Sequence, residues 1–238
     1  MDVIEFLESN YEIFLGWECS CPRISSAREY DPAIYKMRDV LRKYSLIGYH
    51  CTKLTVDEIK EIRTNGMLLQ NAASLKNRVS CLKDSGLLSA DIAQELMNRN
   101  QADDGNRANM LWFCFFEPYL AGRSGIERFF RSWGGEALYN SHEDHPVTGN
   151  ALFNIGTPCV IKAKVPIASL RDSYYPDSSM IRAFLSKRGH QLENEIEHEG
   201  FSSRRIDPQN IIEIVEYPSD QFNALTKCDT WDACDATL

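Results

Sequence analysis

The chain has 238 residues, of which 43% are hydrophobic and 25% are charged. This composition is typical of a soluble globular protein, and the length suits one large domain or a domain with an extension. The net charge of −8 excludes nucleic-acid binding driven by bulk charge, although a local basic groove stays open. No apolar run is long enough to span a membrane and the acidic start is unlike a secretory signal, so we expect a cytoplasmic protein without a membrane partner.

The cysteines and histidines predict no metal site. The sequence has 8 cysteines but no C-x-x-C pair, so we expect reduced thiols and no zinc. Cys114 and Cys159 lie inside apolar runs and are interpreted as small buried hydrophobic residues. His142 and His145 have H-x-x-H spacing, but their acidic neighbours indicate a solvated loop.

Residues 1–45 predict a helical N-terminal extension. Residues 2–16 place apolar side chains at helical spacing. A second helix is expected at residues 30–45, with Asp31 as its N-cap and Pro32 at its first helical position.

The segment after this extension carries the clearest local signals. Residues 46–51 predict a short strand. Thr55 and Glu58 then have the spacing of a capping box, and Gly66 is placed to end the helix in a left-handed conformation.

The rest of the chain predicts a mixture of helices and strands. Helices are expected at residues 87–100, 124–133 and 180–189, and strands at residues 110–116, 158–170 and 211–215. Ser124 and Glu127 form a second capping-box pattern, whereas residues 221–238 predict no clear element. Helices that come early and strands that pair over long distances indicate an α+β class rather than a β-α-β series.

His50 and Thr52 are a candidate ligand-binding pair. They lie two apart at the end of a predicted strand, so their side chains face the same side. A histidine and a hydroxyl on one face can jointly hold a polar ligand such as a ribose or an amide. A solvated pair at a strand end is an equally open interpretation on these residues alone.

The segment "YHCTKLTVDEIKEIRTNGML", residues 49–68, resembles the first motif of the ADP-ribosyltransferase superfamily. In histidine-type members a strand ends in H-x-T or H-x-S, and a helix with the pattern I-x-x-I-x-x-x-G follows. The resemblance implies that His50 contacts the ribose and nicotinamide region of NAD. It also implies that Thr52 and Tyr49 belong to the cofactor-binding residues.

The segment "LWFCFFEPYLAGRSGIERFF" resembles toxins that ADP-ribosylate thymidine in DNA, with their strand, proline-containing turn and Arg-Ser helix start. The resemblance implies that Arg123 lies near the NAD phosphates or the reacting base. Tyr119 resembles the motif-two tyrosine of poly(ADP-ribose) polymerases, which implies that it stacks on nicotinamide. Ser124 would begin the helix beneath them, although a plain N-cap role is the alternative that the residues alone favour. The chain departs from the pattern because Tyr119 to Gly122 separate Pro118 from the arginine.

The segment "LENEIEHEGFSSRRIDPQNIIEIVEY" carries four alternating glutamates: Glu193, Glu195, Glu197 and Glu199. In a strand they face one way, either towards solvent or into a cleft. Superfamily members have a catalytic glutamate at the start of a late strand, followed by I-x-P-x-x-I, which residues 206–211 match. The resemblance implies that Glu197 or Glu195 stabilises the oxocarbenium-like transition state, with Glu199 as a third candidate.

The implied fold is an ADP-ribosyltransferase-like core of two packed mixed sheets with flanking helices and NAD between the sheets. Its expected parts are the helical extension at residues 1–45, a catalytic domain at residues 46–220 and a C-terminal tail at residues 221–238. The implied activity is NAD-dependent mono-ADP-ribosyl transfer with release of nicotinamide. By fold analogy, a bacterial or phage toxin or defence effector is expected.

The acceptor stays open between DNA, RNA, protein and a small molecule, and an antitoxin or regulator protein is a candidate partner. Two other functions also stay open. One is a non-catalytic module on the same fold that binds a nucleotide or a protein. The other is an NAD-dependent RNA 2′-phosphotransferase, against which the lack of a dense basic cluster argues.

Overall fold

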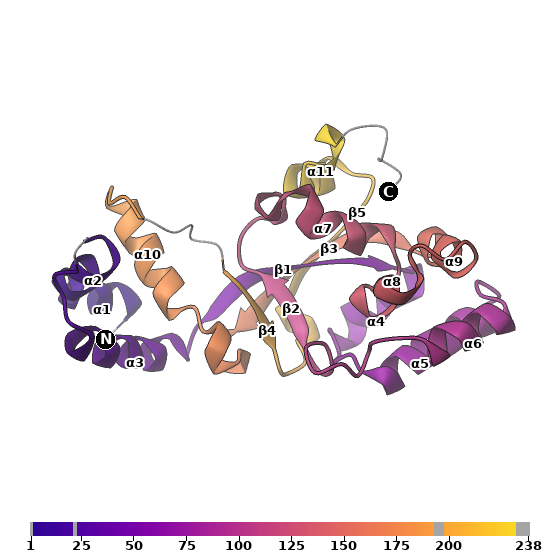
Figure 1. The fold of residues 1–238 in the computed structure, drawn as a ribbon, viewed down its shortest axis with the longest axis horizontal. Coiled ribbons are helices and arrows are strands. Elements are labelled where there is room, and N and C mark those ends of the chain that lie inside the picture. Colours follow the sequence, from indigo (N-terminus) through magenta and orange to yellow (C-terminus); the bar gives the residue numbers. More distant parts are fainter. Residues whose placement is uncertain (1, 21–22, 193–197, 232–238) are drawn as a thin grey trace.

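The computed structural model describes residues 2–20, 23–192 and 198–231. Its strands form one five-stranded sheet in the order β4-β2-β1-β3-β5, and every neighbouring pair is antiparallel (Figure 1). The strands are β1 (Ser45–Leu54), β2 (Leu111–Cys114), β3 (Thr157–Pro166), β4 (Glu199–Ser202) and β5 (Ile211–Glu216).

Helices surround this sheet and connect most of its strands. The α-helices are α1 (Val3–Ser9), α2 (Tyr11–Glu18), α3 (Ala27–Leu41), α4 (Val56–Asn65), α5 (Ala72–Asp84), α6 (Ala90–Asn98), α7 (Gly122–Arg131), α8 (Glu136–His142), α9 (Thr148–Asn154), α10 (Asp177–Lys187) and α11 (Asp220–Thr226). Short 3-10 turns are η1 (Pro118–Ala121), η2 (Ile167–Ser169), η3 (Asp172–Tyr174), η4 (Pro208–Asn210) and η5 (Cys228–Thr230).

The mixed helix-and-strand class expected from the sequence is confirmed, but the described strands form a single sheet rather than two. Helices cover both faces of this sheet, so its apolar side chains are buried without a second sheet. The expected strand in the glutamate-rich segment appears as β4, a short edge strand next to β2.

The central strand β1 has two sides with different neighbours. Side chains alternate along a strand, so His50, Thr52 and Leu54 face one side, which we call the pocket face. Tyr49 and Cys51 pack against the cluster that contains residues of α7, and we call this side the α7 face. The sheet therefore separates odd-numbered from even-numbered residues of β1.

The start of α4 follows the sequence prediction closely. Thr55 accepts a hydrogen bond from the Glu58 amide, and the Glu58 carboxylate accepts from the Thr55 amide, which completes a capping box. Gly66 ends the helix with φ 78°, and a Cβ there would lie 2.0 Å from the Ile206 carbonyl oxygen. Only glycine fits this turn, which leads the chain directly into the pocket wall.

The N-terminal helices form a separate core with α10, at the left of Figure 1. Arg38 of α3 pairs with Asp177 of α10, and Arg182 of α10 pairs with Glu18 of α2. The helical extension expected at residues 1–45 thus packs against a helix from the segment assigned to the catalytic domain.

The predicted start of α3 was wrong. The helix begins at Ala27, because Ser26 and Glu29 form a capping box earlier than the predicted cap at Asp31. Pro32 lies inside the helix rather than at its first position, so the backbone bond that its missing N–H would make is lost.

Two other local predictions also need correction. Ser124 does not cap α7, because the helix already begins at Gly122, and Glu127 pairs along the helix with Arg123 and Arg131 instead of reaching back. The predicted tail contains most of the helix α11, capped by Ser219.

The loop predicted around His142 is shorter than expected, because α8 reaches His142 and α9 already begins at Thr148. His142 is buried at the end of α8 and makes hydrogen bonds to the Thr148 hydroxyl and the Arg99 carbonyl oxygen. Burial lowers the pKa of His142. This histidine therefore joins two helices to a loop rather than facing solvent.

Candidate functional site

A pocket of about 830 Å³ opens on the pocket face of β1. Helices α4 and α5 and residues 66–70 line it together with His50 and Thr52. Its volume lies in the range of about 300–1,000 Å³ that is usual for small-molecule sites. The strand supplies its floor, and the two helices that follow the strand supply its walls.

His50 presents a hydrogen-bond acceptor at this pocket. Its Nδ1 lies 2.8 Å from the Trp112 carbonyl oxygen, which can only accept, so Nδ1 carries the proton. Burial lowers the pKa of His50; the bond to Trp112 opposes this shift, and the charge of Arg78 adds to it. The ring is therefore neutral at pH 7, and its unprotonated Nε2 is an acceptor that no described residue engages.

Thr52 adds a hydroxyl beside this ring. It lies two residues further along β1, opposite the buried Cys159 of β3, and lines the same pocket. Its Oγ1 makes no hydrogen bond to another described residue. Together the two side chains offer an acceptor and a donor on the pocket floor, as expected for a pair that holds a ribose or an amide.

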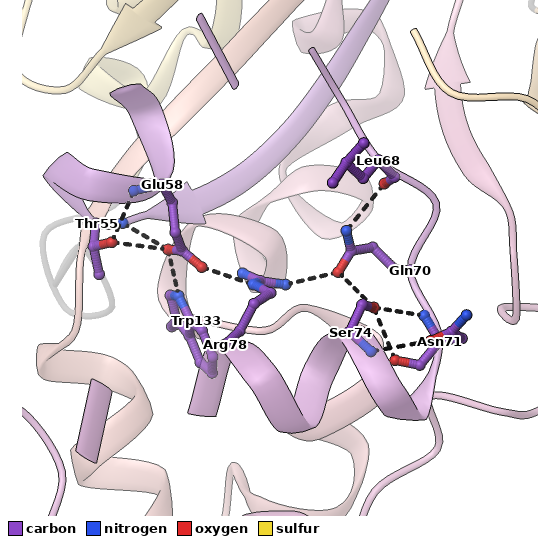
Figure 2. Close-up of polar contacts among 8 residues, drawn as sticks. All are labelled: Thr55, Glu58, Leu68, Gln70, Asn71, Ser74, Arg78 and Trp133. Atoms are coloured by element: carbon purple, nitrogen blue, oxygen red, sulfur yellow. Dashed lines mark hydrogen bonds and ion pairs between the residues drawn. The ribbon is translucent and has the colours of Figure 1, made fainter. Parts of the chain in front are cut away.

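Glu58 lies at the centre of a polar network in the pocket wall (Figure 2). Its Oε2 accepts from the Thr55 amide at 2.9 Å and from Trp133 Nε1 at 2.9 Å, and its Oε1 accepts from Arg78 Nε at 2.7 Å. Burial alone would raise the pKa of Glu58, but the charge of Arg78 and these hydrogen bonds outweigh burial and lower the pKa. Glu58 is therefore ionised, with both oxygens engaged.

Arg78 of α5 is the cation of this network. Its guanidinium lies 4.6 Å from the centroid of the Trp133 ring, and its Nη1 contacts Gln70 Oε1 at 3.4 Å. Gln70 is in turn held by the Leu68 carbonyl oxygen and by the Ser74 hydroxyl (Figure 2). The network therefore fixes the arginine side chain against one wall.

Most of the remaining pocket lining is apolar. The inner part includes Leu54, Ile62, Met67 and Leu82. The rim carries exposed apolar side chains: Val56, Leu68 and Leu87. A ligand that fits this pocket combines an apolar surface, such as a flat ring, with polar groups that reach the floor and the arginine.

The structure brings together only part of the predicted site. His50 and Thr52 share the pocket, whereas Tyr49 points to the α7 face because of strand alternation. Arg123 and Ser124 belong to α7, which packs against that same face. The sheet therefore lies between them and the His50 pocket.

Tyr119 also lies away from the pocket. It belongs to η1, which contacts α7, and Lys227 lies 5.5 Å from its ring centroid. Arg123 is 5.8 Å from the Trp231 ring centroid and pairs with Glu127 at 2.9 Å. These residues form a neighbourhood of their own beside the C-terminal helix.

The predicted catalytic glutamates are described only at one position. Glu193, Glu195 and Glu197 lie outside the described residues. Glu199 begins β4 opposite Cys114, and Cys114 in turn lies opposite Tyr49. By this register Glu199 belongs to the α7 face of the sheet.

Glu58 and Arg78 are pocket residues whose pocket role sequence reasoning did not identify. Glu58 was recognised only as a capping residue. The signal for Arg78 lies in α5, where Leu75, Val79 and Leu82 form the buried stripe and Arg78 stands at its edge. A charged residue at that edge reaches the space between its own helix and the sheet.

Comparisons with family models, with curated proteins and with solved structures find no match to this chain. Over the described ranges, no group of His, Cys, Asp and Glu has the arrangement of a metal site. None of the helices in the described part of the chain is both long and apolar enough to cross a membrane.

Proposed function

We propose that the protein is an NAD-dependent mono-ADP-ribosyltransferase whose NAD site is the pocket beside His50 and Thr52. The observation that carries the proposal is that these two residues line one pocket and keep polar atoms that no described residue uses. The neutral His50 can accept a hydrogen bond from a ribose hydroxyl. The apolar lining suits the nicotinamide or adenine ring.

In the proposed reaction the bond between the ribose C1′ and the nicotinamide nitrogen breaks, and nicotinamide leaves with the bonding electron pair. An oxygen or nitrogen of a macromolecular acceptor forms the new bond to C1′, and its proton passes to a carboxylate or to water. A fixed carboxylate stabilises the positive charge that develops on the ribose. The proposed acceptor is a nucleic acid or a protein, and the proposed role is that of a toxin or defence effector.

Glu58 does not suit the role of this carboxylate. Both of its oxygens are engaged by Thr55, Trp133 and Arg78, and its position is fixed in the pocket wall. Glu195 and Glu197, outside the described residues, stay the proposed charge stabilisers. Replacing each by Gln separates a role in catalysis from a role in NAD binding. Loss of a carboxylate that acts in the transition state lowers the rate on the order of 10²–10³-fold while NAD still binds.

The engaged state of Glu58 also favours a second candidate, a module that binds a nucleotide without turning it over. Incubation of the protein with NAD labelled in the adenosine part, in the presence of separate protein, DNA and RNA pools, distinguishes the two. Transfer of label to one pool, with release of nicotinamide, supports the transferase. NAD binding without release or transfer supports the module. Absence of NAD binding at millimolar concentration contradicts the transferase, and absence of both NAD and ADP binding contradicts the module as well.

A further inference from the structure

We infer that Arg78 is the anion-binding residue of the pocket and that it selects nucleotides with a diphosphate over the corresponding nucleosides. The inference rests on the proposed function in one respect, because it takes the pocket to be a nucleotide site. It differs from the sequence expectation, which assigned the phosphates to Arg123. That residue lies on the α7 face, across the sheet from the pocket.

Arg78 is held in place before any ligand arrives. Its Nε donates to Glu58 at 2.7 Å and its Nη1 contacts Gln70 at 3.4 Å (Figure 2). Its guanidinium carbon lies 4.6 Å from the ring centroid of the fully buried Trp133. Trp133 is itself fixed because its Nε1 donates to Glu58. An arginine fixed in this way loses little side-chain entropy when a ligand binds, which favours affinity.

The guanidinium retains donors for a ligand. Arginine has five N–H groups, of which Glu58 and Gln70 engage one each. The side chain lines the pocket and is 25% exposed, and Nη2 has no acceptor within the described ranges. The free N–H groups of Nη1 and Nη2 form the fork that binds the oxygens of a phosphate or carboxylate in pairs.

The carboxylates near Arg78 do not remove this capacity. Glu58 accepts from several donors, so its charge is spread over an amide, an indole and the guanidinium. Asp57 and Glu61 also line the pocket, but both are exposed, where solvent and salt screen them. Asp57 pairs with Lys60 at 3.0 Å, and Glu61 accepts from Asn65 at 2.7 Å.

The remaining lining defines the class of ligand. Apolar side chains cover most of the pocket, His50 and Thr52 supply an acceptor and a donor, and Arg78 supplies the cation. A nucleoside with a diphosphate matches these three parts: a flat base, ribose hydroxyls and an anionic group. Free phosphate lacks the first two, and a nucleoside lacks the third.

The test compares ADP with adenosine as probes by calorimetry, on the wild-type protein and on Arg78→Met. Wild type is expected to bind ADP about 10- to 100-fold more tightly than adenosine, the range expected for charged hydrogen bonds. Arg78→Met has an unbranched side chain that still covers Trp133 but donates no hydrogen bond, so this preference should fall to less than about threefold while adenosine affinity persists. A merely structural arginine would instead lower both affinities together.

Arg63→Met is the matched control, because Arg63 lies on α4, outside the pocket lining, and contacts Glu216 at the surface. It should keep the wild-type preference for ADP. If Arg78→Met does not fold, the double variant Glu58→Gln/Arg78→Met, which leaves no unpaired charge, replaces it. Equal affinities of wild type for ADP and adenosine, or an unchanged preference in the Arg78 variant, overturn the inference.

The outcome is separable from that of the proposed function. A wild-type preference for ADP that depends on Arg78, without turnover of NAD, supports the inference and contradicts the transferase. Turnover of NAD, with a preference for ADP over adenosine that is unchanged in Arg78→Met, supports the transferase and contradicts the inference.

Discussion

Two cations lie on opposite faces of the sheet at β1, and they have different surroundings: Lys53 belongs to β1 itself, and Arg78 belongs to α5. Lys53 on the α7 face is only 4% exposed, and its ammonium donates to the carbonyl oxygens of Phe153 and, at 3.4 Å, Arg131. Arg78 on the pocket face is 25% exposed and pairs with a carboxylate. Both positive charges lie close to β1, but only Arg78 lines a pocket.

The two cations differ in the hydrogen-bond donors that remain available to a ligand. The carbonyls that Lys53 contacts come from the last turns of α7 and α9, where a helix carries partial negative charge. Lys53 therefore ties two helix ends to the sheet and has no role beyond the core. Arg78 is neutralised by Glu58 but keeps unused donors towards the pocket, so it is suited to a ligand.

The largest expected effect is that of Glu58→Ala on stability. The change leaves the half-buried Arg78 without its counter-charge and the buried Trp133 Nε1 without an acceptor, which costs on the order of 3 kcal/mol of unfolding free energy. Urea unfolding measures it. Glu61→Ala, exposed on the same helix, is the control and should change stability by less than about 0.5 kcal/mol. A similar small loss in both variants would mean that the Glu58 network does not hold the pocket wall.

The second effect is a pH dependence carried by Lys53. Burial lowers the pKa of its ammonium from 10.5 to about 8, so between these values the folded state has released a proton that the unfolded state still binds. Stability carried by Lys53 is therefore constant below about pH 8 and increases with pH above it. At 1.36 kcal/mol per pKa unit the gain reaches about 3 kcal/mol near pH 10.5.

Subtracting the unfolding free energy of Lys53→Met from that of wild type, at each pH from 7 to 10.5, isolates this contribution from other titrating groups. Burial raises the pKa of the Cys159 thiol to about 12, and its contribution has the opposite sign but cancels in the difference. If this difference in unfolding free energy did not change with pH, the two carbonyls would keep Lys53 protonated. Lys53 would then be a permanent cation, as Arg78 is.

A smaller effect is expected at the helix start that leads into the pocket. Thr55→Ala removes the hydroxyl that caps the Glu58 amide, with a cost of about 1 kcal/mol. Thr55→Ser keeps the hydroxyl and should lie close to wild type. Thermal unfolding of the two variants measures the difference, and equal losses would assign the effect to the threonine methyl group instead.

The smallest effect is one of thiol reactivity without loss of stability. Cys81 is exposed and lines the pocket, whereas Cys51 is half-buried on the α7 face. A hydrogen bond with Cys114 and burial raise the pKa of Cys51 well above its usual value. Because the thiolate is the nucleophile, iodoacetamide at pH 8 should modify Cys81 at least about tenfold faster.

Peptide mapping of the alkylated protein gives the two rates separately. Saturating ADP should slow the modification of Cys81 and leave that of Cys51 unchanged. Equal rates for both thiols would contradict the expected difference in reactivity. Protection of Cys51 alone by ADP would place the ligand on the α7 face.

Local signals predicted those parts of the fold that neighbours in sequence determine. The capping box at Thr55 and the glycine turn at Gly66 need only residues within one or two turns, and both were correct. Local reasoning was wrong where two signals competed: the Ser26 capping box overrode Asp31, and ion pairs along α7 engaged Glu127.

The site was harder to predict because it depends on which face of the sheet each segment packs against. The spacing of His50 and Thr52 placed them on one side correctly. Nothing in the segment of Tyr119 and Arg123 states which face of the sheet its helix will cover, and that face proved to be the other one. The sequence did not predict a role for Arg78, because its partners Glu58 and Trp133 are far from it in sequence and only the folded chain brings them together.

The pairing of β1 with β3 has a consequence for how the pocket forms. These strands make the longest ladder in the described sheet, and they bring residues near 50 together with residues near 160. Closing so long a loop costs conformational entropy before the hydrogen bonds between the strands can form. Chains dominated by such pairings therefore fold in milliseconds to seconds. The wall made by α4 and α5 is built from residues close in sequence to β1, whereas the floor lacks its support until β3 arrives. During synthesis the pocket therefore stays incomplete until about two thirds of the chain has emerged.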